Sequence, residues 1–336
     1  MVHTIRELVA APDADSAQRF IAMHPEVRQL EVVGLLVNRS HGAAARDKGR
    51  LAERLGRVVA LLVGSSDEGR QRLVADLASV SHALKGPQPS YAETAEAIRL
   101  VDEMGEQDDL SDLSPELVPA VWDATAHMAT RLHRLTTNQR WNASALRAAR
   151  LAAQATPPDD PGIVLRQEVL AHHLAEEFEQ VRDPAILAEA VALSMQVAEA
   201  TPAEDPSAAR RLNNLAVRMA RQFELDGNRT VLDRAVAFAR AAVDNTPADS
   251  PDLAGRLNNL ANRLGQLYAL TRTPTARRAV AMASAKVAGS GWAAWRSPRW
   301  AARFDSNVGS SGPPARAQAT ARRVVAIASS STAGVR

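Results

Sequence analysis

Two acids and a histidine near the middle of the chain have a spacing that suits metal chemistry. Glu168, His172 and Glu176 lie four residues apart, so an α-helix places their side chains on one face. Carboxylate and imidazole groups together are ligands for divalent metal ions. The adjacent His173 and the alternating acids favour a second interpretation, a solvated helix face whose i,i+4 pairs each contribute about 0.2–0.5 kcal/mol. We expect the solvated face, with no metal site and no cofactor.

Sequence signatures of enzymes are missing. The chain has no cysteine, which excludes disulfides, thiolate metal sites and a cysteine nucleophile within it. It also has no Walker loop, no Gly-x-Gly-x-x-Gly after a strand, no His-Glu-x-x-His and no Gly-x-Ser-x-Gly. The glycines beside Ser290 lie at a repeat boundary and predict a turn. We expect no catalytic residues and a protein that is not an enzyme.

A pair of asparagines occurs twice within nearly identical segments. "RLNNL" begins at Arg211 and again at Arg256, 45 residues later, and the asparagines lie off the apolar positions. Side-chain amides offer both donors and acceptors, which suits an extended peptide backbone. An asparagine at a packed helix junction instead bonds a neighbouring backbone group. Both interpretations stand at this stage.

The asparagines belong to a longer repeat of 45 residues. Thr-Pro occurs at Thr156, Thr201 and Thr246, and an arginine follows ten residues after each threonine. We expect these arginines to pair with acids in the preceding turn. Apolar residues then follow at helical spacing, and a polar break and a second helix complete each copy. The apolar positions are Leu170, Ala171, Leu174 and Phe178, then Leu215, Ala216, Met219 and Phe223, then Leu260, Ala261, Leu264 and Tyr268.

The composition and the repeat together predict an all-α fold. Apolar residues make up 46% of the chain and aromatic residues only 4%, which favours helices over a β-rich architecture. One helix hairpin cannot bury its apolar faces alone, so successive hairpins must stack into an α-solenoid. The small residue in each first helix, such as Ala216, allows the second helix to approach closely.

We expect three regions along the chain. Residues 1–64 form an N-terminal helical leader, and residues 65–110 form a helical hairpin followed by an acidic linker, with a helix start capped by Ser114. Residues 111–336 form the repeat array. Its repeats are expected at about 111–155, 156–200, 201–245 and 246–289, with a degenerate copy at 290–336.

These copies resemble tetratricopeptide repeats, specifically the long variety common in actinobacterial proteins. The resemblance rests on "RLNNLA", the Thr-Pro turns and the 45-residue phasing, although alanine stands where the family has glycine. The leader resembles the helical region that precedes such arrays, and many relatives end in a caspase-like peptidase domain. Because the chain has no cysteine, the resemblance implies the sensing or scaffolding part of that layout.

The resemblance also implies a place for partners. In tetratricopeptide arrays the first helix of each repeat lines a concave groove, so Arg210, Asn213, Asn258 and Asn262 are implied to face it. The implied function is a non-catalytic scaffold or sensor that binds a peptide or a protein. A separately encoded effector enzyme that docks on the array is a further option.

The charge distribution suggests an alternative partner. Residues 290–336 carry seven arginines and one acid, giving 7 − 1 = +6, so the rest of the chain carries 2 − 6 = −4. Three tryptophans alternate with arginines there, which is a plausible platform for single-stranded nucleic acid, although core packing explains Trp300 more simply. The first thirty residues have no secretory signal and no window is apolar enough for a membrane span. We therefore expect a cytoplasmic protein. The alternating residues are Trp292, Trp295, Arg296, Arg299, Trp300 and Arg303.

Overall fold

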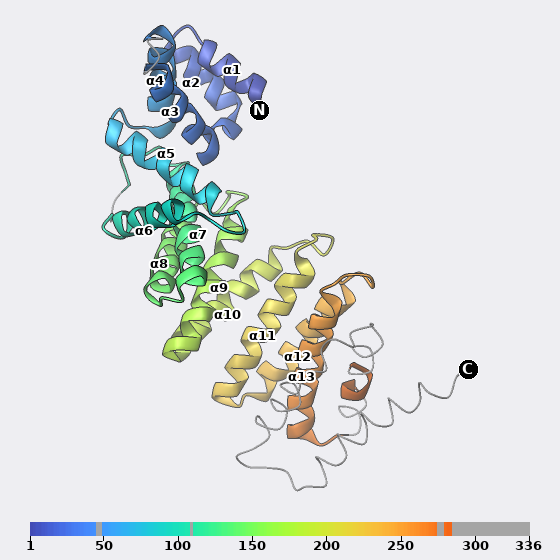
Figure 1. Ribbon diagram of the computed structural model, residues 1–336. Coiled ribbons are helices and arrows are strands. Elements are labelled where there is room, and N and C mark those ends of the chain that lie inside the picture. The colour runs from blue at the N-terminus through green and yellow to red at the C-terminus, as the bar shows by residue number, and fades with distance from the viewer. Residues whose placement is uncertain (45–48, 108–109, 274–278, 284–336) are drawn as a thin grey trace, which may run out of the picture. The chain divides into compact units, whose positions relative to one another are not determined.

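The computed structural model describes residues 1–44, 49–107, 110–273 and 279–283, and every regular element in them is a helix (Figure 1). Helices that follow one another along the chain form packed pairs, for example Val118–Thr136 with Arg140–Gln154 and Ala208–Asp226 with Arg229–Asp244, which confirms the predicted all-α fold of stacked hairpins. The chain divides into two compact units, one ending at Leu193 and the other beginning at Ser194. The last predicted repeat, 290–336, lies outside the described residues.

The first unit has one continuous apolar core that extends from α1 to α10. Fully buried side chains such as Leu8, Leu36, Leu62, Leu100 and Trp141 belong to it. The helices are α1 (Val2–Ala10), α2 (Ala14–Met23), the 3-10 turn Pro25–Arg28, α3 (Leu30–Ala44), α4 (Gly49–Val63), α5 (Glu68–Ala83), α6 (Tyr91–Gly105), α7 (Val118–Thr136), α8 (Arg140–Gln154) and α9 (Ile163–Val181). The division between the two units falls within α10 (Pro184–Glu199).

The C-terminal end of α4 is closed by a segment far away in the sequence. The Ser114 hydroxyl donates to the Leu62 carbonyl at 2.8 Å and the Ser114 backbone N–H donates to the Val63 carbonyl at 2.7 Å. Gly64 ends the helix with φ +84°. The expected helix start capped by Ser114 is therefore wrong, because α7 begins at Val118 without a side-chain cap. The last carbonyls of a helix need donors, and the serine serves α4 instead.

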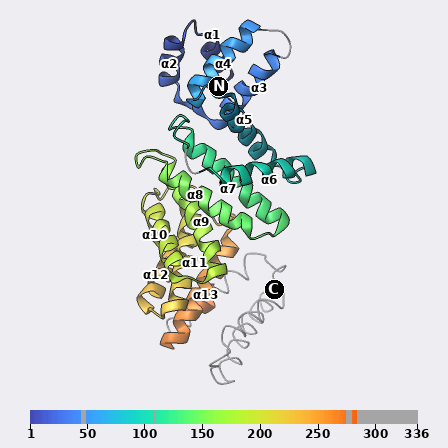
Figure 2. The ribbon, with the colours of Figure 1, turned by 90° about the vertical axis from the view of Figure 1, so that its left-hand side faces the viewer.

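Two arginines connect the α5–α6 pair to the following hairpin, α7 and α8, whose helices are labelled in Figure 2. Arg131 of α7 donates to the carbonyls of Gly86 and Pro87, at 3.0 and 2.8 Å, in the turn between α5 and α6. Arg147 of α8 donates to the carbonyls of Met104 and Gln107, at 3.1 and 2.7 Å. A cation at these carbonyl-rich helix ends is favoured by the helix dipole.

The second unit contains the two copies of the asparagine motif on adjacent helices. Its helices include α11 (Ala208–Asp226), α12 (Arg229–Asp244) and α13 (Leu253–Thr271). All three contact one another, and both ribbon views show them side by side (Figures 1 and 2). Small and branched apolar residues, including Ala216, Val236 and Leu260, form a core between them. The motif helices α11 and α13 are therefore neighbours.

The Thr-Pro turns explain the ten-residue distance between threonine and arginine. Thr246 donates its hydroxyl to the Ala242 carbonyl at 2.5 Å and accepts a hydrogen bond from Arg256 at 2.6 Å. Arg256 also contacts Asp252 at 3.0 Å. This threonine–arginine link joins the end of one hairpin to the first helix of the next.

The other two copies follow the same plan with one variation. Arg211 bonds Thr201 at 2.8 Å and lies 3.6 Å from Asp205. Arg166 instead bonds Asp123 of α7 at 2.8 Å and lies 3.7 Å from Asp160. The predicted pairing of these arginines with acids of the preceding turn is confirmed.

Candidate binding surfaces

The repeated asparagines lie on α11 and α13, and we call them the amide face. They are half-buried. The Asn259 amide nitrogen donates to the Asn213 side-chain oxygen at 3.0 Å. One predicted site residue is therefore bonded to an asparagine of the neighbouring first helix, and not to a backbone group. The face consists of Asn213, Asn214, Asn258, Asn259 and Asn262.

The remaining predicted site residues lie on the same two helices. Arg210 is exposed near the start of α11, and it and Asn258 both interact with other groups. Asn262 is half-buried one turn beyond Asn258. Among the described residues the side chains of Asn214 and Asn262 form no hydrogen bond with the protein. The structure thus brings the predicted residues to one pair of helices and leaves some amide groups with free donors and acceptors.

Further along the same helices lies a polar cluster that the sequence analysis did not identify. Gln266 donates to Glu224 at 2.9 Å, and Arg221 bonds the same carboxylate at 2.7 Å. Arg263 contacts Gln266 at 3.3 Å, and its Nε is buried with no hydrogen-bond partner in the described part of the chain. Burial lowers the pKa of Arg263, Glu224 opposes this effect and Arg221 adds to it. A desolvated guanidinium with open donors favours an acceptor-rich ligand.

On α9 the candidate metal ligands do not form a metal site. No group of three acids and histidines that could hold a metal ion occurs in the described parts of the chain. His172 and Glu176 form the expected exposed i,i+4 pair at 3.3 Å. The prediction of a fully solvated face is wrong for His173 and Glu168, which are only 2% and 7% exposed. His173 faces α7, where its Nε2 lies 3.3 Å from the Thr130 hydroxyl.

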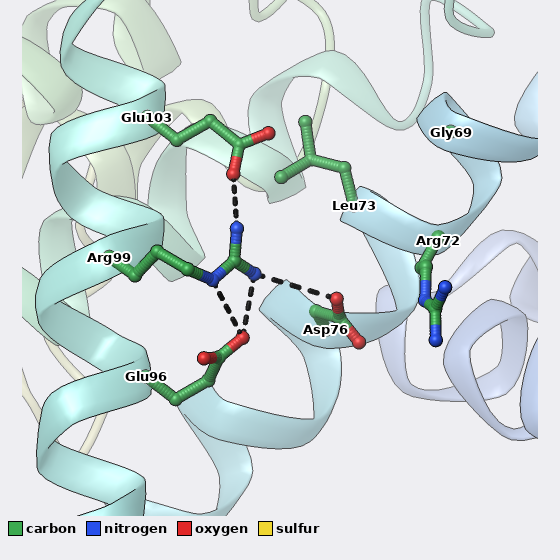
Figure 3. Close-up of a pocket in the computed structure, with 7 residues that line it drawn as sticks. All are labelled: Gly69, Arg72, Leu73, Asp76, Glu96, Arg99 and Glu103. Carbon is green, nitrogen blue, oxygen red and sulfur yellow. Dashed lines mark hydrogen bonds and ion pairs between the residues drawn. The ribbon is translucent and has the colours of Figure 1, made fainter.

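A polar cleft of about 370 Å³ lies between α5 and α6 (Figure 3). Arg99 is at its centre, with its guanidinium surrounded by three carboxylates. It bonds both Glu96 and Glu103 at 2.6 Å and lies 3.6 Å from Asp76 of α5. Burial, and then the nearby Glu96, raises the pKa of the Asp76 carboxyl. Arg72 lies on the far side of Asp76, turned away from Arg99 (Figure 3).

The contacts in this cleft link two helices. Arg99 uses both edges of its guanidinium on Glu96 and Glu103 of its own helix, and its 3.6 Å ion pair with Asp76 joins α6 to α5. The sequence signal for part of this cluster was present, because Glu96 and Glu103 are three and four residues from Arg99. The contribution of Asp76 depends on the packing of α5 against α6, which no local pattern predicts.

Fold and surfaces together define an all-α helical-repeat protein with polar residues on adjacent first helices. Among the described residues, no helix is both long and apolar enough to cross a membrane. No protein-family model matches the chain, and no curated protein matches it. A solved structure with similarity to it is the crystal structure of BtubC (BKLC) from P. vanneervenii. That chain is 17% identical, with 78% of this chain and 88% of the other aligned and a TM-score of 0.42.

Proposed function

We propose that this protein is a cytoplasmic, non-catalytic scaffold built from tetratricopeptide-type repeats, and that it binds an extended peptide segment of a partner on the amide face. One observation carries the proposal: half-buried amides and the buried Nε of the half-buried Arg263, on adjacent first helices, have unmet hydrogen-bonding capacity within the described residues. A peptide backbone offers both donors and acceptors along its length. It can therefore complete these groups through its main-chain amides and carbonyls.

The repeat assignment rests on the sequence motif and on the hairpins. The 45-residue phase, the Arg-Leu-Asn-Asn-Leu motif and the helix pairs support a tetratricopeptide type. A scaffold of this kind recruits partners, including a separately encoded effector enzyme. We propose Arg210, Asn213, Asn258 and Asn262 as residues of the binding surface. Arg263 is added because of its buried, incompletely bonded guanidinium.

The proposal distinguishes structural from binding asparagines. Asn213 bonds Asn259 between α11 and α13, so its replacement should cost stability as well as binding. The Asn262 amide forms no hydrogen bond among the described residues, so its replacement should affect binding more than stability. A double-mutant cycle on Asn213 and Asn259 should give a coupling of about 0.5–1.5 kcal/mol in unfolding.

Selection from a random-peptide display library against the full chain tests the proposal. Enriched peptides are measured by fluorescence anisotropy against the wild type, against Asn258→Ala with Asn262→Ala, and against a control. The control is Asn245→Ala, which removes an exposed amide at the C-cap of α12. We expect affinity to fall by about 5- to 150-fold only in the double variant, since two lost hydrogen bonds total about 1–3 kcal/mol. Peptides that bind all three proteins equally, or no enrichment at all, would refute the proposal.

A further inference from the structure

A second, chemically different surface lies on α7 in the first unit. His127, Arg131 and Arg134 are four and three residues apart, so they share one face of the helix. Lys85, in the turn after α5, lies near them, because Arg131 bonds the carbonyls of the next two residues of that turn, Gly86 and Pro87. We call these four residues the basic patch. His127, Arg134 and Lys85 are exposed and Arg131 is half-buried.

The positive charges of the basic patch are only partly neutralised. Lys85 has a single loose ion pair, 3.6 Å from Glu31, and both side chains remain more than half exposed. Arg131 bonds two neutral carbonyl groups, so its charge is not cancelled, and its Nε is buried without a partner in the described parts of the chain. The charged groups that act on His127 are all basic. The patch therefore lacks anionic partners within the described residues that would match its charge.

We propose that the basic patch binds an acidic segment of a partner protein. From His127 to Arg134 the patch spans about 10 Å along the helix at 1.5 Å per residue. That length matches two or three carboxylates of an acidic stretch. Stable nucleic-acid binding instead needs many phosphate contacts, about 6–10 in typical complexes, which is more than four side chains provide. The residues outside 290–336 carry a net charge of −4. The basic patch on α7 is therefore a local feature and not a consequence of the overall charge.

Binding of carboxylates should be coupled to the protonation of His127. Although His127 keeps an exposed surface, partial desolvation, followed by the charges of Lys85, Arg134 and Arg131, lowers the pKa of its imidazole. It is therefore neutral in the free protein at neutral pH. A carboxylate bound beside it would raise that pKa again, so binding should strengthen as the pH falls. Glu31, which pairs with Lys85, is the acid that competes with the ligand for the patch.

Fluorescence anisotropy with a labelled hexaglutamate peptide tests the assignment on the full chain. A hexaglutamine peptide and a thymidine hexanucleotide are the comparison probes, at an ionic strength of about 50 mM to limit screening. We expect hexaglutamate to bind, hexaglutamine not to bind, and the oligonucleotide to bind more weakly. Lys85→Gln with Arg134→Gln should weaken hexaglutamate binding about tenfold, as expected for two exposed charge pairs.

Matched controls separate a local site from general electrostatics. Arg229→Gln with Arg240→Gln removes the same charge from exposed positions of α12 and should change affinity less than about twofold. His127→Gln should abolish most of the increase in affinity on lowering the pH from about 7.5 to 5.5. Equal losses in both double variants, no binding of hexaglutamate, or tighter binding of the oligonucleotide would each overturn the proposal.

Discussion

Gly64→Ala should detach the end of α4 from the segment that closes it. A Cβ at Gly64 would lie 2.5 Å from the Ser114 backbone nitrogen and 2.9 Å from its hydroxyl. The chain has no room to yield, because this nitrogen is bonded to the Val63 carbonyl at 2.7 Å. Alanine is also strained at the glycine's φ of +84°. The strain costs about 1–2 kcal/mol and two weakened hydrogen bonds about 0.5–1 kcal/mol each, so we expect a loss of roughly 2–4 kcal/mol.

Hydrogen exchange followed by mass spectrometry measures this effect locally. Amides of α4 should exchange about 30- to 1,000-fold faster, since 1.4 kcal/mol corresponds to a factor of ten. Gly105→Ala is the matched control in the same unit, because its Cβ would meet no atom within 4 Å and alanine favours helix. If α4 exchanged at the wild-type rate in Gly64→Ala, or at the same rate in both variants, the reasoning would be refuted.

Four further variants test other contacts. Thr246→Val removes the buried hydroxyl that bonds Arg256 and the end of α12 and should cost about 1–2 kcal/mol in urea unfolding; an unchanged midpoint would contradict the link. Ser90→Ala breaks the capping box with Glu93 and should cost about 1 kcal/mol. The hydrogen bond from the Ser90 N–H lowers the pKa of the Glu93 carboxyl. The carboxylate therefore stabilises the fold above its unfolded pKa, and this stabilisation is lost as the pH falls through the folded pKa. Unfolding of Glu93→Gln measured across pH would show this dependence. Asp76→Asn should stabilise the protein at neutral pH and have no effect at low pH. Burial raises the pKa of the Asp76 carboxyl, so its ionised form is the less favourable one in the folded protein. A loss of stability at neutral pH would mean that the contact with Arg99 outweighs burial.

The repeat made the helices predictable, because apolar spacing and Thr-Pro turns act locally. Leu215 and Leu260, both from the apolar positions, are buried as their spacing indicates. Ser114 was predicted wrongly for the converse reason. Its local sequence suits a helix cap, but its hydroxyl bonds a carbonyl 52 residues away. Rules based on neighbouring residues cannot predict a contact between residues that far apart in the sequence.

Partners of the predicted site residues were less predictable than their positions. Asn213 corresponds to Asn258 in the next copy, yet it bonds Asn259, 46 residues away. The offset of one residue depends on how α11 and α13 are rotated against each other. That rotation is set by packing, so the sequence predicts which helices carry the amides but not which amides meet.

A basic residue recurs at one position of the repeat, buried in two copies and half-buried in the third, and this position shows how packing changes a periodic residue. His173, Arg218 and Arg263 are 45 residues apart. His173 lies 3.3 Å from the Thr130 hydroxyl. Arg218 donates to the buried Ser194 hydroxyl at 2.8 Å. In both cases a hydroxyl from an earlier helix contacts the buried basic side chain. This contact offsets part of the desolvation cost of burying that side chain.

The third base has no such hydroxyl. Ala239 occupies the place that corresponds to Ser194 one repeat earlier, and Arg263 keeps a buried Nε without a partner in the described residues. If the position served packing alone, an apolar residue would be the more stable choice, because an incompletely bonded buried charge is costly. The open guanidinium lies on the helix that carries Asn258 and Asn262. An acceptor-rich ligand on the amide face would therefore satisfy Arg263 and the open amides together, which supports the binding role that we propose for α11 and α13.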